Sequence, residues 1–396
     1  MNYQKIDKCR ICGNTELIPF LDLGEQALTG RFPKNPTEEI DRWPLELVKC
    51  FDWCGLVQLN HSFDKAKLYN EHYGYRSSLN RSMADHLARV AYIVKTIAQP
   101  VQGDVIVDIG SNDGTFLNQF SAIYERIGID PTAEKFRRFY DQTITRIPDF
   151  FKKEYVKKKA KIITTIAMLY DLENPMQFVE DVRDCLADDG IWAIEVADFD
   201  KLLANGIYDN VCHEHVEYYT LNQLEYMFKK AHLKIIDFGY TATNGGSLFI
   251  VAAKIGSSYP QTLMEIPEDP YSMAPYYQFR NRVYQHRQEL LTMIDGRHVA
   301  GYGASTKGNV ILQFCGITTE QIPYIVEVNE DKFNHVTPGT NIPIISERIA
   351  RDFKPDYYLV LPWHFKQSIL ERERDFDGSF IFPFPTAHII SKQEVT

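Results

Sequence analysis

The sequence predicts an α/β fold, with a small separate region first, then a central doubly wound sheet, then a second α/β unit. Two observations predict this arrangement. Short apolar runs that suit buried strands recur between residues 105 and 253, separated by helix-length segments, which is typical of a largely parallel sheet covered on both faces. The same alternation begins again at residue 298, after a stretch that contains Pro260, Pro267, Pro270 and Pro275.

The composition is that of a soluble globular chain. Of the 396 residues, 44% are hydrophobic and 24% are charged, and the length predicts two to four domains. We expect no membrane segment, because no apolar run approaches the ~18–20 residues that cross a bilayer, and the N-terminus carries no secretory signal. A cytoplasmic location is therefore expected. The net charge of −10 disfavours nucleic acid as a partner, since binding phosphates requires a basic face.

The individual elements follow from apolar spacing. Residues 68–99 are predicted to be mostly helical, because Met83, Leu87, Val90 and Val94 recur every three or four positions. Another helical pattern covers 115–120, and the lysine-rich segment 152–161 is interpreted as a solvated helix face. Strands are predicted at 105–109, 126–130, 161–165, 190–196, 233–240 and 247–253, and in the last unit at 298–302, 324–328, 357–361 and 379–382. The expected division is 1–70, 71–255, a linker and helix at 256–296, and 297–396.

Four of the seven cysteines form two close pairs, Cys9 with Cys12 and Cys50 with Cys54, and each pair is followed by glycine. Such pairs place four thiolates around one tetrahedral zinc ion, and glycine suits the tight turn toward the metal. Four cysteine ligands leave no open position, so the zinc would be structural. The alternative is four unrelated buried thiols.

A glycine loop follows the strand at 105–109. Its sequence, from Asp108 through Gly110 to Asp113 and Gly114, does not match the dinucleotide pattern G-x-G-x-x-G. Two carboxylates repel a pyrophosphate and favour a ligand with cationic groups, such as S-adenosylmethionine (SAM). Asp130, at the end of the next strand, is placed to accept both ribose hydroxyls. A simple turn, or a different nucleotide, are the alternatives.

The densest group of ionisable side chains is Cys212-His213-Glu214-His215. It lies after the fourth strand of the central unit, where ligand loops collect, and its spacing does not match H-E-x-x-H. A histidine beside carboxylates suits a general base, whereas a structural cluster and a metal site with Cys212 are the alternatives. The following Asn244-Gly245-Gly246-Ser247 is by itself a hairpin turn signal.

A second glycine loop opens the C-terminal unit. The segment 301–309 follows a strand and opens a helix, and Lys307 lies beside the exposed amides expected at that helix start. This arrangement is a candidate phosphate site, with a packing turn as the alternative. Glu327 and His364 follow later strands of the same unit.

Taken in order, these segments resemble the SAM-dependent nucleotide-sugar C-methyltransferases, which methylate C3 of 4-keto-deoxysugar nucleotides. The resemblance spans the whole chain and rests on 9–13, 50–59, 108–114, 212–219, 244–248, 301–309 and 362–365. It implies an N-terminal zinc-binding domain, a central SAM domain, and a C-terminal Rossmann-like domain that helps to hold the nucleotide sugar. It favours a monomer that binds no nucleic acid.

The resemblance also implies roles for individual residues. The family's base matches His215, with Glu214 beside it, while Cys212 stands where the family has an active-site tyrosine. Tyr73 or Tyr75 could serve in its place, and Tyr170 replaces a family histidine. The expected SAM-binding residues are Asp108, Gly110, Asn112, Asp113, Gly114, Asp130 and Thr165, and the expected substrate-binding residues are His213, Gly246, Ser305, Lys307, Asn309, Glu327 and His364.

The implied reaction explains these residue types. A ketone at C4 makes the C3 proton removable as an enolate, which then attacks the SAM methyl group. The protein supplies a base, His215 tuned by Glu214, and a tyrosine hydroxyl toward the enolate oxygen. Competing functions are methylation of oxygen or nitrogen on a small molecule, oxidoreduction with NAD, and sugar binding without catalysis.

Overall fold

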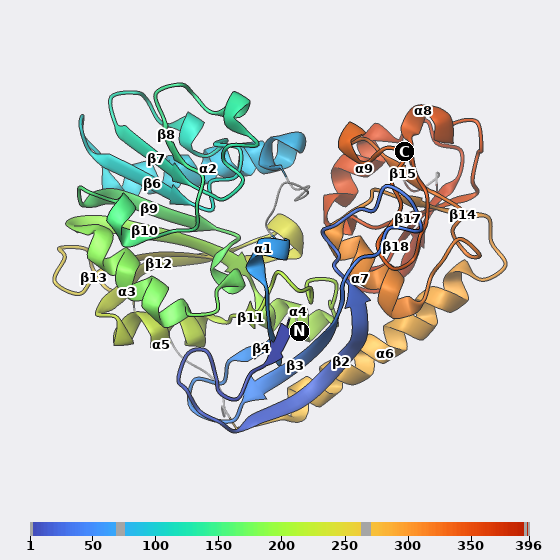
Figure 1. Ribbon diagram of the computed structural model, residues 1–396, viewed down its shortest axis with the longest axis horizontal. Coiled ribbons are helices and arrows are strands. Elements are labelled where there is room, and N and C mark those ends of the chain that lie inside the picture. Colours follow the sequence, from blue (N-terminus) through green and yellow to red (C-terminus); the bar gives the residue numbers. More distant parts are fainter. Residues whose placement is uncertain (1–2, 69–75, 263–270, 392–393, 395–396) are drawn as a thin grey trace.

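The computed structural model describes residues 3–68, 76–262, 271–391 and 394, and it shows two α/β lobes side by side (Figure 1). The central part of the chain forms one lobe and the C-terminal part forms the other. Strands β2 (Leu17–Ala27) and β3 (Arg42–Cys50) run along the base between the lobes, and helix α6 (Ala274–Ile294) lies along β2. No helix among the described residues is long and apolar enough to span a bilayer.

The central sheet has seven strands in the order β12-β13-β10-β9-β6-β7-β8, and only β13 runs antiparallel to its neighbours. The six predicted strands are confirmed, and a seventh, β8, is added at an exposed edge that has no apolar run. The strands are β6 (Val105–Ile109), β7 (Glu125–Ile129), β8 (Thr145–Ile147), β9 (Ala160–Ile166), β10 (Leu186–Ala197), β12 (Leu233–Thr241) and β13 (Ser247–Lys254).

Helices cover both faces of this sheet. Helix α2 (Arg81–Ala98) packs Met83, Leu87, Val90 and Val94 against one face, which confirms the predicted apolar stripe. It begins at residue 81 rather than 68, because Asn80 caps its first turn by accepting a hydrogen bond from the Ser82 amide. Helices α3 (Pro175–Cys185) and α5 (Leu221–Lys230) pack against the other face.

Two predicted helices are absent from the described chain. Residues 115–120 contain only the short 3-10 turn η2 (Leu117–Gln119), because the Asp113 carboxylate binds the Thr115 hydroxyl at 2.6 Å and holds a tight turn. The lysine-rich segment 152–161 contains only η4 (Lys153–Tyr155) before β9 begins.

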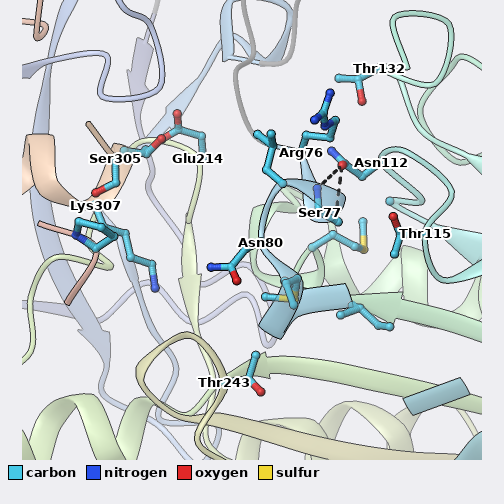
Figure 2. Close-up of a pocket in the computed structure, with 18 of the residues that line it drawn as sticks. Arg76, Ser77, Asn80, Asn112, Thr115, Thr132, Glu214, Thr243, Ser305 and Lys307 are labelled. Carbon is cyan, nitrogen blue, oxygen red and sulfur yellow. Dashed lines mark hydrogen bonds between the residues drawn. The ribbon is translucent and has the colours of Figure 1, made fainter. Parts of the chain in front are cut away.

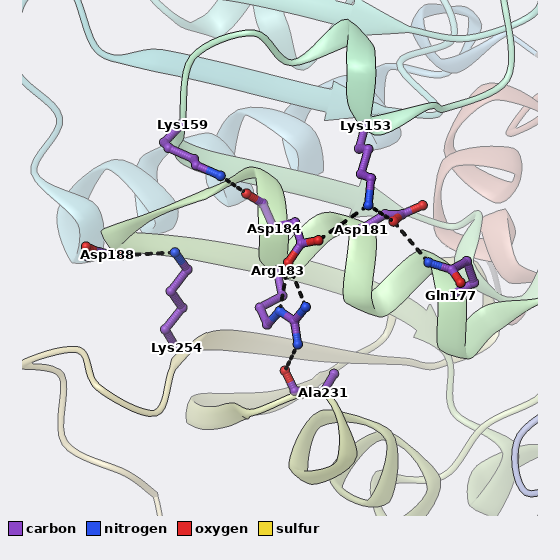
Figure 3. Close-up of polar contacts among 9 residues, drawn as sticks. All are labelled: Lys153, Lys159, Gln177, Asp181, Arg183, Asp184, Asp188, Ala231 and Lys254. Atoms are coloured by element: carbon purple, nitrogen blue, oxygen red, sulfur yellow. Dashed lines mark hydrogen bonds and ion pairs between the residues drawn. The ribbon is translucent and has the colours of Figure 1, made fainter.

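Those lysines are solvated, as expected, but they pair with acidic groups from neighbouring elements. Lys153 lies 3.1 Å from Asp181 and 3.5 Å from Asp184, both on α3, and the Lys159 amine reaches the Asp184 carbonyl (Figure 3). Lys158 and Lys161 likewise contact Glu125 and Asp189. The basic run therefore fastens a loop to α3 and to strand ends and does not form a single helical face.

The N-terminal region forms a four-stranded sheet with one strand borrowed from the central part of the chain. Its order is β11-β4-β3-β2, where β4 is Val57–Leu59 and β11 is Glu217–Tyr218, directly after the His-Glu-His segment. Strands β1 (Tyr3–Lys5) and β5 (His61–Phe63) pair separately, and α1 (Lys65–Leu68) follows. The N-terminal region therefore holds the segment that carries the predicted base.

The C-terminal lobe has a six-stranded sheet in which β19 alone is antiparallel to its neighbour. Its order is β16-β15-β14-β17-β18-β19, and it includes the four predicted strands. The strands are β14 (Val299–Tyr302), β15 (Ile325–Glu327), β16 (Ile344–Ser346), β17 (Tyr357–Val360), β18 (Ser379–Phe382) and β19 (His388–Ile390), and the helices are α7 (Thr306–Cys315), α8 (Glu347–Ala350) and α9 (Lys366–Arg372).

One hydrophobic core joins the N-terminal sheet, the C-terminal lobe and residues 199–218 of the central part of the chain. It contains Trp43 from β3, Phe199 from α4 (Phe199–Asn205), Tyr208, Phe279 from α6 and Phe384. A second core joins the central sheet to the cysteine pairs of the N-terminal region. Because densely packed side chains have little freedom to move relative to one another, these two cores hold both lobes against the N-terminal region.

Candidate active site

A cavity of about 620 Å³ lies where the carboxyl edge of the central sheet faces the C-terminal lobe. Its walls come from the loops after β6, β7, β9 and β10, from the start of α2, and from the loop before α7. Figure 2 shows Asn112, Thr115 and Thr132 on one side of this space, with Glu214, Ser305 and Lys307 on the other. A volume of this size is typical of sites for small molecules.

Asp108 lies near the end of β6 with its side chain almost fully buried. Its carboxylate accepts a hydrogen bond from the Thr164 hydroxyl at 2.6 Å. Burial raises the pKa of Asp108 to about 7, although the bond from Thr164 offsets part of that rise. Burial therefore disfavours the ionised carboxyl group, and a cation in the cavity would stabilise it.

Gly110 begins the loop with a φ of +79°, and a Cβ there would lie 2.9 Å from the side chain of Met168. The glycine therefore allows the β6 and β9 loops to meet below the cavity. The next residues bind one another across two strands. The Asn112 amide donates to Asp130 at 2.8 Å, and the Asn112 side chain accepts from the Ser77 amide at 3.0 Å.

Asp130 also accepts the Thr132 amide at 2.7 Å and the Thr132 hydroxyl at 2.6 Å. Burial raises its pKa above the usual value for aspartate. The three other residues expected near SAM lie behind the wall. Asp113 binds the Ser78 amide at 2.9 Å, Gly114 packs on the Tyr140 ring, and Thr165 accepts a hydrogen bond from the Trp192 indole at 3.0 Å.

His215 lines the cavity and is oriented by a backbone carbonyl. Its Nδ1 lies 2.9 Å from the carbonyl oxygen of Asn210, which can only accept, so Nδ1 carries the proton and Nε2 keeps a lone pair. The Tyr170 ring lies edge-on, 4.4 Å from the imidazole centre. Burial, together with the positive charge of Lys307, lowers the pKa of His215 to about 3. The imidazole is therefore neutral at physiological pH.

The neighbours of His215 point in different directions. Glu214 lines the cavity and accepts a hydrogen bond from Thr29 at 3.5 Å, and burial raises its pKa. The expectation that Glu214 tunes His215 is not met by the described contacts, in which Asn210 fills that role. Cys212 is also in the wall, as a buried thiol with a pKa raised by burial. His213 faces away and binds the Trp43 carbonyl at 3.0 Å.

The C-terminal lobe supplies the opposite wall. Ser305 caps α7 by accepting the Gly308 amide at 3.0 Å, and Lys307 follows it into the cavity wall. Glu327 accepts the amides of Ala304, Val328 and Asn329, and it lines the cavity together with His364. Besides His213, two other expected substrate residues lie outside the wall. Asn309 binds the Thr29 carbonyl at 2.7 Å, and Gly246 packs on Lys201.

Several lining residues were missed by sequence reasoning, among them Arg76, Asn80, His86, Glu195 and Thr243. His86 belongs to the apolar stripe of α2, so its position predicts only burial. Glu195 could have been recognised from the sequence as a candidate site residue, because a carboxylate inside the apolar strand 191–197 requires a partner. Tyr73 and Tyr75 lie outside the described residues.

The four paired cysteines meet at one point. Their sulfur atoms all lie within 4.8 Å of one another, with Cys9 3.5 Å from Cys54 and Cys12 3.5 Å from Cys50. Thiolates around a tetrahedral zinc ion at ~2.3 Å stand a little under 4 Å apart, so the cluster fits zinc with all four positions filled. The ion would be structural and would supply no chemistry to the cavity.

Comparison with known proteins agrees with this architecture. Three family models match successive parts of the chain: "Putative zinc binding domain" at residues 9–69, "Methyltransferase domain" at 75–237 and "C-methyltransferase C-terminal domain" at 242–385. The C-methyltransferase NovU of Streptomyces niveus is 28% identical over 412 residues, which cover 98% of each chain.

Solved structures match less than half of the chain, at lower identity. A SAM-dependent methyltransferase from Clostridium acetobutylicum is 11% identical with a TM-score of 0.35, over 43% of this chain and 92% of its own. The plantazolicin methyltransferase BpumL is 14% identical with a TM-score of 0.36, over 45% and 87%. The chain is therefore similar along its whole length to a C-methyltransferase, and its parts match in order a zinc-binding domain, a methyltransferase domain and a C-methyltransferase C-terminal domain.

Proposed function

We propose that this enzyme methylates C3 of a 4-keto-6-deoxy nucleotide sugar, with His215 as the base that removes the C3 proton. The observation that carries the proposal is the lone pair on His215 Nε2, in the wall of a cavity shared by the two lobes. The cavity combines Asp108 and Asp130 from the central sheet with Lys307 from the C-terminal lobe. These charges suit a cationic methyl donor on one side and an anionic nucleotide on the other.

The chemistry requires a ketone beside the reacting carbon. A sugar C–H bond is too weak an acid for an imidazole, but a carbonyl at C4 lets the charge spread onto oxygen as an enolate. SAM supplies an electrophilic methyl group, and Asp108, Gly110, Asn112 and Asp130 are the residues that would hold it. Because the two bound reactants are held next to each other, their orientation supplies much of the rate enhancement beyond that from proton removal.

His215 takes the proton at Nε2, while the Nδ1 proton stays in its bond to Asn210. The nearby positive charge of Lys307 disfavours a protonated imidazole, so Lys307 holds the proton affinity of His215 low in the free enzyme. A diphosphate bound at Lys307 would neutralise that charge. Substrate binding would then make His215 a stronger base at the moment when it is needed.

The enolate oxygen requires a hydrogen-bond donor. Tyr170 is the described tyrosine best placed for this role, since it lines the cavity and its ring contacts His215. Its hydroxyl could take the place of the family tyrosine that Cys212 replaces. One such donor is worth about 10²–10³ in rate, and Tyr170→Phe measures it directly.

The experiment compares His215→Asn with His298→Asn, which changes an exposed histidine of the C-terminal lobe. We expect the His215 variant to lose 10²–10⁴-fold in C-methylation of a 4-keto-6-deoxy nucleotide sugar while it still binds SAM. Exchange of the C3 hydrogen in deuterium oxide without SAM should fall equally, because it reports deprotonation alone. A loss below tenfold would exclude His215 as the base, and a product methylated on oxygen or nitrogen would exclude C-methylation of this substrate.

A further inference from the structure

A buried chain of four hydrogen-bonded side chains lies in the cavity region and takes no part in the steps above. His86 Nε2 lies 2.6 Å from Glu195 Oε2, and the Thr243 hydroxyl lies 3.1 Å from His86 Nδ1. The Thr241 hydroxyl donates to Glu195 Oε1 at 3.3 Å. His86 is 5% exposed and Glu195 is 2% exposed, yet both line the cavity together with Thr243.

Glu195 lies on the same face of the sheet as Asp108. Asp108 pairs with Thr164 of β9, and Glu195, on the other side of β9, pairs with Ile166. Residues 106, 162, 191 and 193 of these strands pack with α2, so the alternation along each strand puts Asp108 and Glu195 on the face that α2 covers. The two carboxylates therefore flank the end of β9, separated by two strand spacings, or about 10 Å.

The glycine loop after β6 also contacts the residues that follow β9. Met168, after β9, lies against Gly110, and the Ala167 amide donates to the Glu195 carbonyl at 2.8 Å. The end of β9 thus connects the loop expected to hold SAM with the strand that carries Glu195. Glu195 lies two residues farther along the strands than Asp108, toward the carboxyl edge of the sheet that faces the C-terminal lobe.

The Glu195 carboxyl group is held in the cavity wall by two neighbours. His86 Nε2 contacts Oε2 and the Thr241 hydroxyl donates to Oε1, while the other His86 nitrogen faces the Thr243 hydroxyl. Among the described residues no lysine or arginine forms an ion pair with Glu195. A cationic ligand in the cavity would therefore have a fixed carboxyl group to pair with.

We propose that Glu195, held in place by His86, is the counter-charge for the methylsulfonium of SAM and makes the enzyme bind SAM more tightly than S-adenosylhomocysteine (SAH). Methyl transfer breaks the S–CH₃ bond, leaves its electron pair on sulfur and forms the C–C bond with the enolate pair, so SAH has lost the sulfonium charge. The α-ammonium group is common to both molecules. The attraction to Glu195 therefore ends with the reaction, which favours release of SAH.

The test measures binding of three ligands to Glu195→Gln by calorimetry at pH 8, without sugar substrate. The ligands are SAM, SAH and sinefungin, whose amine replaces the methylsulfonium. We expect the Kd values for SAM and sinefungin to rise about tenfold, while that for SAH changes less than about twofold, because only the first two carry the charge that Glu195 meets. Glu225→Gln is the matched control, since Glu225 pairs with Lys229 at 2.8 Å on α5, outside the cavity wall.

Two further variants separate charge from packing. Glu195→Asp keeps the charge and should retain most of the preference for SAM over SAH. His86→Phe keeps a ring but removes the N–H that orients the carboxylate, and it should lower the preference in the same direction, so a misfolded Glu195→Gln still leaves a test. Equal weakening of SAM and SAH, or unchanged Kd values in a folded Glu195→Gln, would overturn the proposal. Because no acceptor is present, these outcomes are independent of the base assigned to His215.

Discussion

Binding of SAM should release a proton from Asp108. The folded protein holds this carboxyl with a pKa of about 7, since burial disfavours its charged form and the Thr164 hydroxyl offsets only part of that effect. At pH 7 about half of the molecules therefore carry a protonated Asp108. A cationic ligand beside the carboxyl favours its ionised form.

The size of the release follows from the pKa. An opposite charge within contact distance lowers a carboxyl pKa by about 1–3 units. With a bound value near 5, almost every Asp108 is ionised at pH 7, so about half a proton leaves for each SAM bound. At pH 8.5 only ~3% of free Asp108 is protonated, and the release nearly vanishes.

The assay is calorimetric titration with SAM in two buffers of different ionisation enthalpy, at pH 7 and again at pH 8.5. The difference in observed enthalpy between the buffers gives the number of protons released. Asp108→Asn should lose the release at pH 7, and its residual value gives any contribution from Asp130. A release that is equal at both pH values, or that persists unchanged in Asp108→Asn, would refute the assignment of Asp108 to the cationic end of SAM.

Three other predictions follow. Asp108→Asn should stabilise the SAM-free protein at pH 8 by as much as about 4 kcal/mol in chemical unfolding. The reason is that the pKa of Asp108 is about 7 in the folded protein and lower in the unfolded chain, so its ionisation destabilises the fold fully above pH 7 and not at all below pH 4. An unchanged unfolding curve at pH 8 contradicts this. Burial is the main cause of the low pKa of His215, and it remains in Lys307→Met, so this variant should raise that pKa only in part from its value of about 3; an imidazole NMR titration that stays unchanged excludes the influence of Lys307. Cys54→Ser should lose bound zinc in metal analysis and lower Tm, whereas Cys185→Ser, outside the cluster, should keep its zinc.

Most of the fold could be predicted because its signals are local. Strands β6, β9 and β10 are continuous apolar runs, and the cysteine pairs carry their spacing in the sequence itself. Edge strands were harder to find. β8 contains Thr145-Arg146-Ile147 and buries none of the three residues fully, so no apolar pattern distinguishes it from a loop.

The site could be predicted only where one segment carries it. His213 and His215 are two residues apart, and residue types and spacing alone give no means of choosing between them, so His215 was selected only by the family resemblance. In the structure His213 is held by Trp43 of the N-terminal sheet, whereas His215 faces the cavity. The pair of His86 and Glu195 joins residues 109 positions apart, so it could not be recognised before the fold placed α2 over β10.

For the lysine-rich segment 152–161, the sequence predicted exposure but not the backbone conformation. Its charge predicts exposure, which is confirmed, but charge alone does not determine backbone conformation. The acidic residues Asp181 and Asp184 on α3 bind Lys153 where the chain is irregular. The interpretation as a helix was wrong because these partners come from a different element, which no period within residues 152–161 could reveal.

The zinc-binding domain also has a direct mechanical connection to the proposed base. Arg10 lies between two of the cysteine ligands, and its guanidinium donates to the Leu59 carbonyl at 2.8 Å. The Leu59 amide in turn donates to the Val216 carbonyl at 2.9 Å, while the Val216 amide donates to the Tyr170 carbonyl at 2.9 Å.

Val216 is therefore held from both sides, by the N-terminal sheet and by the loop after β9, and it directly follows His215. A catalytic base must be held within about 0.5 Å of its productive position, and these hydrogen bonds help to fix the segment that carries it. The cysteine cluster is therefore connected through the backbone to the segment of the proposed base, because Arg10, between two of the cysteines, binds the strand that clamps the histidine segment.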